Sequence, residues 1–512
     1  MDINIGSLLT KRANLSGSLE AIVEPVIGRR LTFTELNRAS NRVANGLLGL
    51  GVRKGDRVGL LLMNGAEFVA SFFGAAKIGA VVVPLNWRLV PDELEFILAD
   101  SGTKVLLFSE EFSAVTAELD RRGDRTLVEA WVQVGGTPAH YASSFDKWSA
   151  AASDAEPPIR GADDDLMFIM YTSGTTGLPK GVMHTHNTVL WALLTIVATA
   201  DTHYADRYLI SLPMFHVGAL SPLLGSLYRG VTLVVLKAFD PKLSWELIGS
   251  EKITTTLMVP AMLQFMLAVY DPEHHDPSSL RWIMSGAAPV PVSLIKTYQA
   301  MGIEIHQVYG LTETGGPACL IIGDDAVERA GSCGKAFFHT DVRVANADGH
   351  DVKDGETGEV LVRGPHVMLG YWNRAEATQE TIIDGWLHTG DVATMDSDGF
   401  ITIMDRVKDM LISGGENVYP AEIENVVLSH PKVADVGVIG VPSDKWGESP
   451  LAVVVRNDDS LTEQEVIDWC KGKLAPFKLV KAVVFTTDIP RNPSGKILKR
   501  MLRDQYRVTA SE

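Results

Sequence analysis

A loop of small and hydroxylated residues follows a short apolar run in the first half of the chain. It reads Tyr171-Thr172-Ser173-Gly174-Thr175-Thr176-Gly177-Leu178-Pro179-Lys180-Gly181. Glycines let backbone N–H groups approach an anion closely, hydroxyls add further donors, and Lys180 adds a positive charge. The loop therefore predicts phosphate binding, with a surface turn of small polar residues as the structural alternative. It is not the P-loop of other nucleotide enzymes, because that loop has four residues between its glycines and a serine or threonine after its lysine.

Later segments supply the other groups that a nucleotide site needs. Ser285-Gly286-Ala287-Ala288-Pro289 follows a strand-like run, and its small residues would let a flat base lie against the backbone. Gln307-Val308-Tyr309-Gly310-Leu311-Thr312-Glu313 offers a ring for stacking, a hydroxyl, and a carboxylate of the kind that binds Mg²⁺. Asp391 and Arg406 can bond to ribose hydroxyls or to a phosphate. Together the segments predict an ATP site.

The loop resembles, over its whole length, the signature loop of the adenylate-forming superfamily. That superfamily holds acyl-CoA synthetases, aryl-CoA ligases, peptide-synthetase adenylation domains and firefly-type luciferases. The resemblance runs from Leu31 to Ile497, with the other motifs in the family's order. It implies an enzyme that uses ATP and Mg²⁺ to convert a carboxylic acid to an acyl-adenylate, and then transfers the acyl group to coenzyme A.

The resemblance also implies roles for individual residues. In the family, Thr312 contacts the α-phosphate, Glu313 binds Mg²⁺ together with Thr176, and Lys496 bridges the substrate carboxylate and the α-phosphate. We therefore expect Lys180, Thr312, Glu313 and Lys496 to be catalytic. The expected ATP-binding residues are Thr172, Ser173, Gly174, Thr175, Thr176, Gly177, Lys180, Gly286, Ala287, Ala288, Gln307, Val308, Tyr309, Gly310, Thr312, Asp391, Ile403, Arg406 and Lys496.

For thioester formation the family swings its small C-terminal domain about a hinge residue, which here is Lys408. The swing replaces the lysine loop by a glycine-rich turn. The glycines of this turn let the pantetheine arm of CoA approach the backbone closely. The resemblance implies CoA contacts at Ser413, Gly414, Gly415, Trp446, Phe477, Lys478 and Lys481. Val480 stands where many relatives have proline, so these contacts depart in part from the family pattern.

The acyl pocket should be walled by the segment around His216. Peptide-synthetase domains have an aspartate there to bind an ammonium group, so amino acids are disfavoured as substrates. Acetate-activating relatives close the pocket with tryptophan where this chain has Gly310, so we expect a longer acid. The expected acyl-binding residues are His216, Val217, Gly218, Met258, Gly310, Gly315 and Gly316. The overall pattern favours a medium- or long-chain fatty acid, with aryl acids of the coumarate, ferulate or benzoate type, or loading of an acyl carrier, as alternatives.

An α/β fold must position these groups. Strand-like runs at 57–63, 231–236 and 254–259 alternate with helix-period segments at 67–78 and 292–300, which is typical of sheets covered by helices. Residues 150–165 are polar and predict an exposed connector. We expect an N-terminal domain over 1–404 and a mobile domain over 405–512. The latter should contain a helix from Pro420, strands at 433–439, 451–455 and 482–485, and a helix at 463–474.

Composition narrows the function classes. A chain of 512 residues exceeds the size of one compact core, so several domains are expected. The net charge of −17 disfavours nucleic acid as a partner. The three cysteines have neither metal nor disulfide spacing, which favours a cytoplasmic protein. No secretory signal or apolar span is found, so we expect a soluble protein with at most peripheral membrane contact. We expect it to be a monomer or a homodimer.

Two further alternatives concern catalysis and metals. A non-catalytic sensor is disfavoured because the lysines and acidic residues that do chemistry are present. The histidine pairs 184/186 and 274/275 lack a wider set of ligands, so we interpret them as surface histidines rather than as a metal site.

Overall fold

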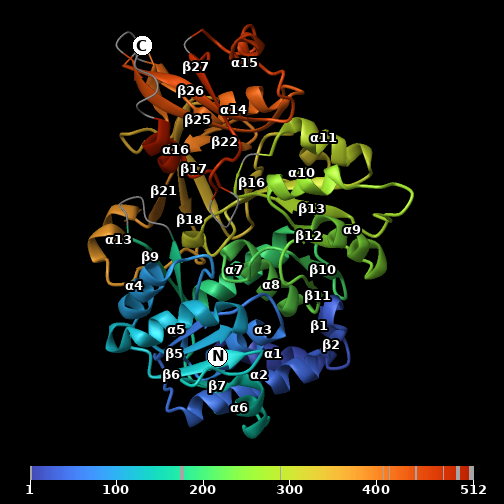
Figure 1. Cartoon of the computed structure of the whole chain (residues 1–512), viewed down its shortest axis with the longest axis vertical. Helices are drawn as coiled ribbons and strands as arrows, with labels where there is room; N and C mark the ends of the chain where they lie inside the picture. The colour runs from blue at the N-terminus through green and yellow to red at the C-terminus, as the bar shows by residue number, and fades with distance from the viewer. Residues whose placement is uncertain are drawn as a thin grey trace.

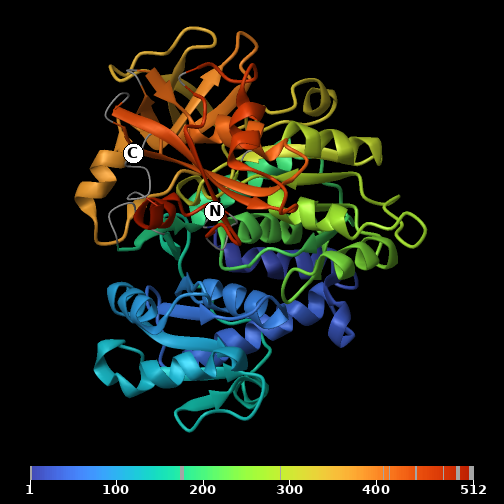
Figure 2. The same cartoon turned by 45° about the horizontal axis from the view of Figure 1, so that its top comes forward.

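The structure is a computed structural model that describes residues 3–172, 178–288, 290–406, 409–413, 416–443, 447–476, 478–491 and 496–506. Within these residues the strands form four sheets, three in the larger N-terminal part and one in the smaller C-terminal part (Figure 1). Figure 2 shows the small part, in orange and red, seated above the green strands and helices of the large part. The predicted α/β class with a large and a small part is confirmed.

An eight-stranded sheet carries both ends of the phosphate loop. In chain order its strands are β3 (Arg57–Leu61), β4 (Val81–Pro84), β5 (Thr103–Ser109), β6 (Ala130–Val134), β7 (Ala142–Ser144), β8 (Leu166–Thr172), β9 (Lys180–Thr185) and β19 (Gly370–Tyr371). Strands β8 and β9 are antiparallel, with Thr172 opposite Lys180. The sheet therefore holds the two ends of the loop next to each other.

A nine-stranded sheet carries the base-binding and Mg²⁺-binding motifs. Its strands are β1 (Glu20–Glu24), β2 (Arg29–Thr32), β10 (Arg207–Ile210), β11 (Thr232–Val235), β12 (Thr255–Leu257), β13 (Trp282–Ser285), β14 (Glu304–Tyr309), β15 (Cys319–Leu320) and β16 (Lys335–Ala336). Strands β13 and β14 are parallel, with Ser285 opposite Gln307. The carboxyl ends of parallel strands meet at one edge, where α/β proteins bind ligands, so the two motifs that follow these strands lie side by side.

Helices cover both sheets. They are α1 (Ile5–Ser16), α2 (Phe33–Gly49), α3 (Ala66–Lys77), α4 (Pro91–Ser101), α5 (Ser113–Arg121), α6 (Phe145–Ala151), α7 (His186–Thr199), α8 (Val217–Arg229), α9 (Pro241–Ser250), α10 (Pro260–Ala268), α11 (Val292–Ala300), α12 (Asp324–Glu328) and α13 (Ala375–Thr381), with 3-10 turns η1 (Pro25–Ile27), η2 (Glu110–Phe112), η3 (Gly123–Arg125) and η4 (Thr312–Thr314). The predicted strands at 57–63, 231–236 and 254–259 and the predicted helices at 67–78 and 292–300 are confirmed as β3, β11, β12, α3 and α11.

Local sequence explains two of these helices. Thr32 and Glu35 form a capping box that starts α2, since each side chain bonds to the other's backbone N–H. Helix α3 is apolar on all sides and almost wholly buried, because it packs against α1 and α2 within the largest hydrophobic core.

The predicted connector at 150–165 begins within the last turn of α6 and continues without regular structure to Asp165. Most of its residues are exposed, as expected. The carboxylate of Glu156 nevertheless lies 2.8 Å from the fully buried ammonium of Lys77. The connector is thereby fixed to α3.

The third sheet leads to the small domain. Its strands are β17 (Asp341–Ala345), β18 (Thr357–Arg363), β20 (Ile382–Ile383), β21 (Trp386–Met395) and β22 (Ile401–Arg406). Strand β22 pairs antiparallel with β21 and places Arg406 opposite Asp391. The domain boundary that we expect after residue 404 falls inside β22.

The small domain has a hydrophobic core of its own, formed by residues such as Val436, Val454 and Val466. Its elements are β23 (Leu411–Ser413), β24 (Glu416–Val418), α14 (Pro420–Leu428), β25 (Val433–Ser443), β26 (Gly447–Arg456), α15 (Glu463–Cys470), β27 (Ala482–Thr486) and α16 (Lys499–Tyr506). They confirm the predicted elements except at one end. The helix expected to reach residue 474 ends at Cys470, because Lys471 is extended and Gly472 has a φ of +73°.

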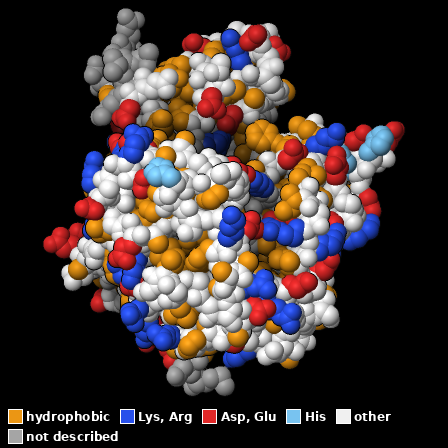
Figure 3. Space-filling model, turned by 60° about the horizontal axis from the view of Figure 1, so that its bottom comes forward, with side chains coloured by type: hydrophobic (Ala, Val, Ile, Leu, Met, Phe, Trp, Pro, Cys, Tyr) orange, Lys and Arg blue, Asp and Glu red, His pale blue; other side chains and the backbone are white. Residues whose placement is uncertain are grey.

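The surface carries no dominant basic region on the face shown in Figure 3, where lysine and arginine side chains are interspersed with acidic ones. Across the described ranges, no helix has both the length and the apolar composition needed to cross a bilayer.

Candidate active site

Lys180 and Glu313 are brought together by a tyrosine from a third segment. The ammonium of Lys180, at the start of β9, lies 5.0 Å from the centre of the Tyr371 ring. The hydroxyl of Tyr371 donates to Glu313 Oε1 at 2.9 Å. A cation–π contact and a hydrogen bond to a carboxylate both fix geometry. The second oxygen of Glu313 remains suited to an Mg²⁺ ion that is also bound by phosphate, since Mg²⁺ commonly takes one or two protein carboxylates.

The turn that carries Glu313 is held by two buried histidines. Nε2 of His184 donates to the Thr312 carbonyl at 2.8 Å, and Nδ1 of His366 donates to the Thr314 carbonyl at 2.9 Å. Because a carbonyl only accepts, these bonds fix the tautomer of each ring. Burial lowers the pKa of both histidines to about 4. Both rings are therefore neutral at pH 7, and no positive charge from them competes with a metal ion.

A second group gathers where β14, β21 and β22 meet. Tyr309 donates its hydroxyl proton to Asp391 Oδ2 at 2.7 Å, and Nε of Arg406 lies 3.0 Å from Asp391 Oδ1. Burial, reinforced by the Asp391 carboxylate, raises the pKa of Tyr309 well above its ordinary value, so this tyrosine stays a donor. The arrangement brings together three residues that the sequence predicts for ATP binding.

The segment after β13 packs closely on β14. A Cβ atom on Gly286 would lie 2.4 Å from the Val308 carbonyl oxygen, so only glycine fits there. Ala287 has a φ of +68°, a left-handed conformation that is uncommon for a residue with a side chain and is often found at functional sites. The side-chain NH₂ of Gln307 donates to the Ser332 carbonyl at 2.7 Å, so this hydrogen bond is made within the protein.

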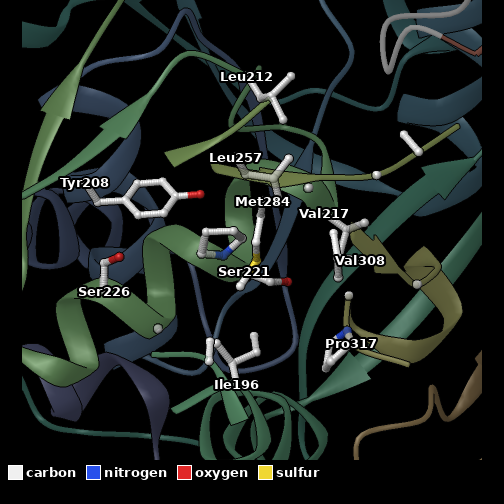
Figure 4. Close-up of a pocket in the computed structure, with 18 of the residues that line it drawn as sticks. Ile196, Tyr208, Leu212, Val217, Ser221, Ser226, Leu257, Met284, Val308 and Pro317 are labelled. Carbon is white, nitrogen blue, oxygen red and sulfur yellow. The ribbon is translucent and has the colours of Figure 1, made fainter. Parts of the chain in front are cut away.

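A cavity of about 130 Å³ lies beside the segment that follows β14 and is lined by residues of α7, α8 and strands β10, β12, β13 and β14 (Figure 4). Five of the residues predicted for acyl binding line it, namely His216, Val217, Gly218, Gly310 and Gly316. Four of the residues predicted for ATP binding line it, namely Gly286, Ala287, Val308 and Gly310, of which Gly310 is predicted for both sites. The wall is therefore shared between the two predicted sites, as adenylation of an acid requires.

Two of the predicted acyl-binding residues lie outside this wall. Met258 is fully buried in the hydrophobic cluster that includes Trp245 and Leu263. Gly315 lies against His184, and its carbonyl accepts from the Ser221 hydroxyl at 2.6 Å. Met258 donates its backbone N–H to the carbonyl of Met284, which lines the cavity, and Ser221, which bonds to Gly315, also lines it. Both residues therefore support the cavity wall.

His216 starts the helix that forms one wall of the cavity. Its Nδ1 accepts from the Gly218 N–H at 3.2 Å, which caps the N-terminus of α8. Since Nδ1 accepts, the proton of the neutral ring is on Nε2. Burial lowers the pKa of His216 to about 4, so the ring is neutral at pH 7.

The remaining predicted residues lie on the third sheet or the small domain. Ile403 is half-buried on β22, and Ser413 ends β23. Lys478 forms an ion pair with Glu422 at 2.7 Å, and Lys481 donates to the Pro476 carbonyl. Lys496 lies next to Ile497, which pairs with Arg491. Ser173, Gly174, Thr175, Thr176, Gly177, Lys408, Gly414, Gly415, Trp446 and Phe477 lie outside the described residues.

Our interpretation of His184 and His186 as surface residues is wrong. Both are buried, and His186 accepts the Ile5 N–H through Nδ1. Strand alternation gives a signal for His184, because it lies on the same face of β9 as the buried Val182. His274 is exposed as expected, and the part of the chain that the structure describes contains no cluster of three or more histidine, cysteine or acidic residues placed to hold a metal ion.

Tyr371, His366 and Ser221 are functional residues that no motif in the sequence predicts. Tyr371 is on a two-residue strand, and His366 is in the segment before it, so neither has a periodic pattern around it. All three act by contacts with residues far away in the chain, and no local motif encodes such contacts.

Known proteins share both the sequence and this fold. The family model described as "AMP-binding enzyme" matches residues 9–372, and the model "AMP-binding enzyme C-terminal domain" matches residues 422–496. The long-chain-fatty-acid–CoA ligase FadD13 of Mycobacterium tuberculosis is 45% identical over 510 residues, which cover 99% of each chain. A feruloyl-CoA synthase of an Amycolatopsis species is 40% identical and covers 98% of this chain and 99% of its own.

A solved structure places the same architecture around an adenylate. The anthranilate CoA ligase AuaEII, in complex with anthranoyl-AMP, superimposes with a TM-score of 0.93 at 31% identity and covers 100% of this chain and 98% of its own. Sequence and fold agree over nearly the full length. The chain therefore belongs to the AMP-binding enzyme family, within the adenylate-forming superfamily that its motifs resemble.

Proposed function

We propose that this chain is an AMP-forming acid–thiol ligase that converts a fatty acid to its acyl-adenylate and then to its CoA thioester. One observation carries the proposal. Glu313, which bonds to Tyr371 beside Lys180, and Tyr309, which bonds to Asp391, belong to the segment that contains Gly310 and Gly316, and these two glycines line an apolar cavity. A nucleotide and an apolar acid would therefore meet at the Thr312–Thr314 turn.

In the first half-reaction a carboxylate oxygen of the acid attacks the α-phosphorus of ATP, and pyrophosphate leaves. The acid and ATP both carry negative charge, so the site must hold anions together. Lys180 supplies positive charge, Asp391 can accept from the ribose hydroxyls, and the Thr312 hydroxyl can donate to the α-phosphate. Glu313 and, in the phosphate loop, Thr176 would hold Mg²⁺, which when bound neutralises phosphate charge. The predicted role of Lys496 is to bridge the carboxylate and the α-phosphate.

In the second half-reaction the CoA thiolate attacks the acyl carbonyl carbon, the bond to the phosphate oxygen breaks, and AMP leaves. We infer that the small domain moves for this step about Lys408 and presents the turn that contains Gly414 and Gly415. The separate core of the small domain supports such movement as a unit. We therefore propose two domains, 1–404 and 405–512, of which the second moves.

The fatty-acid substrate is supported by the apolar cavity wall and by the likeness to FadD13. The cavity volume favours an aryl acid as the second candidate. A cavity of about 150 Å³ holds one benzene ring, which is close to the 130 Å³ found in this structure. The feruloyl-CoA synthase and the anthranilate CoA ligase belong to that second class by their names.

The testing experiment measures AMP and acyl-CoA formation by the purified chain with ATP, Mg²⁺ and CoA. The acids range from acetate to long-chain fatty acids and include benzoates and hydroxycinnamates. We expect fatty acids to give both products. Preference for ring acids would move the enzyme to the aryl-CoA ligases, AMP with thioester formed only on a carrier protein would indicate carrier loading, and no AMP with any acid would overturn the proposal.

The division of labour is tested by Lys496→Ala. We expect this variant to lose adenylate formation and to keep thioester formation from supplied acyl-adenylate. Equal loss in both half-reactions would contradict the role of Lys496 given above.

We also propose that the protein works in the cytoplasm. The three cysteines are free thiols and are buried, which supports our expectation of a reducing cytoplasm. We keep both a monomer and a homodimer as the proposed assembly, and light scattering of the purified chain decides between them.

A further inference from the structure

We propose that the acyl cavity recognises an oxygen atom on the acyl tail of the substrate, through hydrogen bonds to Tyr208 and Ser226. This inference rests on the proposed function and makes it more specific, because it concerns the chemical class of the acid. It predicts a carboxylic acid that carries a hydroxyl or carbonyl group distant from its carboxylate.

The two side chains are enclosed and face the same space. Tyr208, on β10, is 5% exposed, and Ser226, on α8, is 4% exposed. Both line the cavity. Figure 4 shows the ring of Tyr208 directed into the cavity with its hydroxyl leading, and Ser226 on the helix at the same side.

The Tyr208 hydroxyl has a proton left to donate. The hydroxyl hydrogen-bonds to the backbone of Leu257, and the direction of the effect on its pKa identifies the N–H as the donor. Burial raises the pKa of Tyr208 above its ordinary value, so the phenol keeps its proton at pH 7. Among the residues that the structure describes, none is recorded as an acceptor of that proton.

The Ser226 hydroxyl also lacks a hydrogen-bond partner among the described residues. Within the described part of the chain its Oγ forms no hydrogen bond, and the residue lines the cavity. A buried hydroxyl without a partner is destabilising. Substrate oxygen in the cavity would supply the hydrogen-bond partner that each hydroxyl lacks.

A third serine provides the contrast. Ser221 also lines the cavity from α8, but its hydroxyl donates to the Gly315 carbonyl at 2.6 Å. Most of the remaining wall is apolar, with residues such as Trp282, Met284 and Phe337. Apart from Thr202, His216 and Ser221, the rest of this wall is suited to hydrocarbon, and Tyr208 and Ser226 add two hydroxyl groups to it.

The volume limits the acid further. Since a cavity of about 150 Å³ holds one benzene ring, 130 Å³ suits one ring or a similarly compact chain. The shared chemistry is a distal oxygen, on a phenol or on an aliphatic chain, and the two sources are separated by experiment.

The experiment compares matched pairs of acids that differ by one hydroxyl. One pair is phenylpropanoate and para-hydroxyphenylpropanoate, and the other is hexanoate and ω-hydroxyhexanoate. For each pair kcat/KM is measured with the full chain and with Tyr208→Phe, Ser226→Ala and the control Tyr204→Phe. Tyr204 is exposed, and its hydroxyl bonds to Ser16 at the N-terminal helix.

We expect the unaltered chain to prefer the hydroxylated acid in at least one pair, and the preferred pair identifies the ring or chain source. In Tyr208→Phe and in Ser226→Ala the ratio of the two kcat/KM values should fall about 3- to 10-fold, the size of one neutral hydrogen bond. The Tyr204→Phe ratio should equal that of the unaltered chain.

Two results overturn the inference while the proposed function stands. One is a ratio of one or less in both pairs while fatty acids are ligated, and the other is a fall of equal size in all three variants. Thermal shifts with each acid alone give a readout that does not depend on turnover. If a variant fails to fold, the ratio of the two kcat/KM values in the unaltered chain still tests whether the cavity prefers the hydroxylated acid. Absence of AMP formation with every acid would instead overturn the proposed function.

Discussion

Asp405 and Arg406 are consecutive residues at the end of β22, yet their side chains bind to opposite halves of the molecule. Arg406 lies 3.0 Å from Asp391 of β21 in the large part. Asp405 accepts from the Ala421 N–H at 3.0 Å and lies 3.4 Å from the Lys499 ammonium, both in the small domain. The end of β22 is therefore attached to both halves, two residues before Lys408, the predicted hinge.

Lys499→Met should destabilise the small domain. Lys499 is buried between Asp405 and Glu424, at 3.4 Å and 3.2 Å. Burial opposes its charge, but the two carboxylates prevail and raise the pKa of Lys499. Removing the cation leaves two buried carboxylates unpaired, which costs about 3 kcal/mol. Chemical denaturation followed by fluorescence measures the loss.

The adjacent Arg500→Met provides the matched control. Arg500 is exposed and pairs with Asp504 at 3.8 Å, also in the exposed surface. Exposed pairs contribute about 0–1 kcal/mol, so the free energy of unfolding should change little. Equal destabilisation by the two variants would contradict the importance of the buried network.

His184→Gln should weaken the dependence of stability on pH. The pKa of His184 is about 4 in the folded chain and 6.5 when exposed. The folded state thus binds fewer protons between these values, so stability is complete above pH 6.5 and falls as the pH falls toward 4. The effect amounts to about 3 kcal/mol for this histidine. A glutamine can still donate to the Thr312 carbonyl but cannot take up the proton.

Denaturation of the unaltered chain and of His184→Gln at pH 7 and pH 4.5 measures this difference. His350→Gln, at an exposed position, is the control and should show the pH dependence of the unaltered chain. An unchanged pH dependence in His184→Gln would show that the buried ring is not responsible.

Tyr371→Phe should weaken the response to Mg²⁺. The variant keeps the ring under Lys180 but loses the hydrogen bond from its hydroxyl to Glu313. Loss of a group that orients a metal ligand typically reduces metal affinity by about 10-fold. Calorimetry of ATP binding across an Mg²⁺ titration measures the shift. Identical titrations for Tyr371→Phe and the unaltered chain would remove Tyr371 from the metal site.

Gly225→Ala should narrow the cavity and stabilise the fold. Gly225 is within α8 and lines the cavity, and a Cβ atom there would lie 3.6 Å from a methyl group of Ile196, an ordinary contact. An alanine in a helix is more stable than glycine by about 0.5–1 kcal/mol. We expect a higher Tm and a lower kcat/KM for the longest accepted acid relative to shorter ones. A preference that stays constant across the acid panel would place the acyl tail elsewhere.

Gly310→Ala, unlike Gly225→Ala, should disturb the fold of the site and reduce activity. A Cβ atom on Gly310 would lie 1.5 Å from the Gly316 carbonyl oxygen, so the backbone must move. Because this loop continues into the Thr312–Thr314 turn, we expect loss of activity with every acid. Full activity in Gly310→Ala would show that the loop can adjust without cost.

Much of the fold was predictable because its signals are local. Apolar periodicity gave β3, α3 and α11, and a proline at the first turn gave the start of α14. The short strands β19 and β20 gave no such signal, since two residues cannot show a period. Their positions depend on pairing with β9 and β21.

The site was predictable where a motif carries its own chemistry, and less so where residues act by distant contacts. Glu313 and Asp391 stand in motifs, whereas Tyr371 is joined to Glu313 only by folding. The polarity of the cavity was also hidden in the sequence. Tyr208 lies in a strand without a recognisable motif, and it comes to line the same cavity as Ser226 only when α8 packs on β10.

The turn that carries Glu313 also has a mechanical consequence. It follows a strand of the nine-stranded sheet, yet one of its carbonyls is bound by His184 from the eight-stranded sheet, and another by His366 from the segment after β18. Three sheets are thereby joined at one turn. In hydrogen exchange, the slowest amides of all three sheets should open together as one cooperative unit, and those of the small domain, which has a separate core, should open on their own.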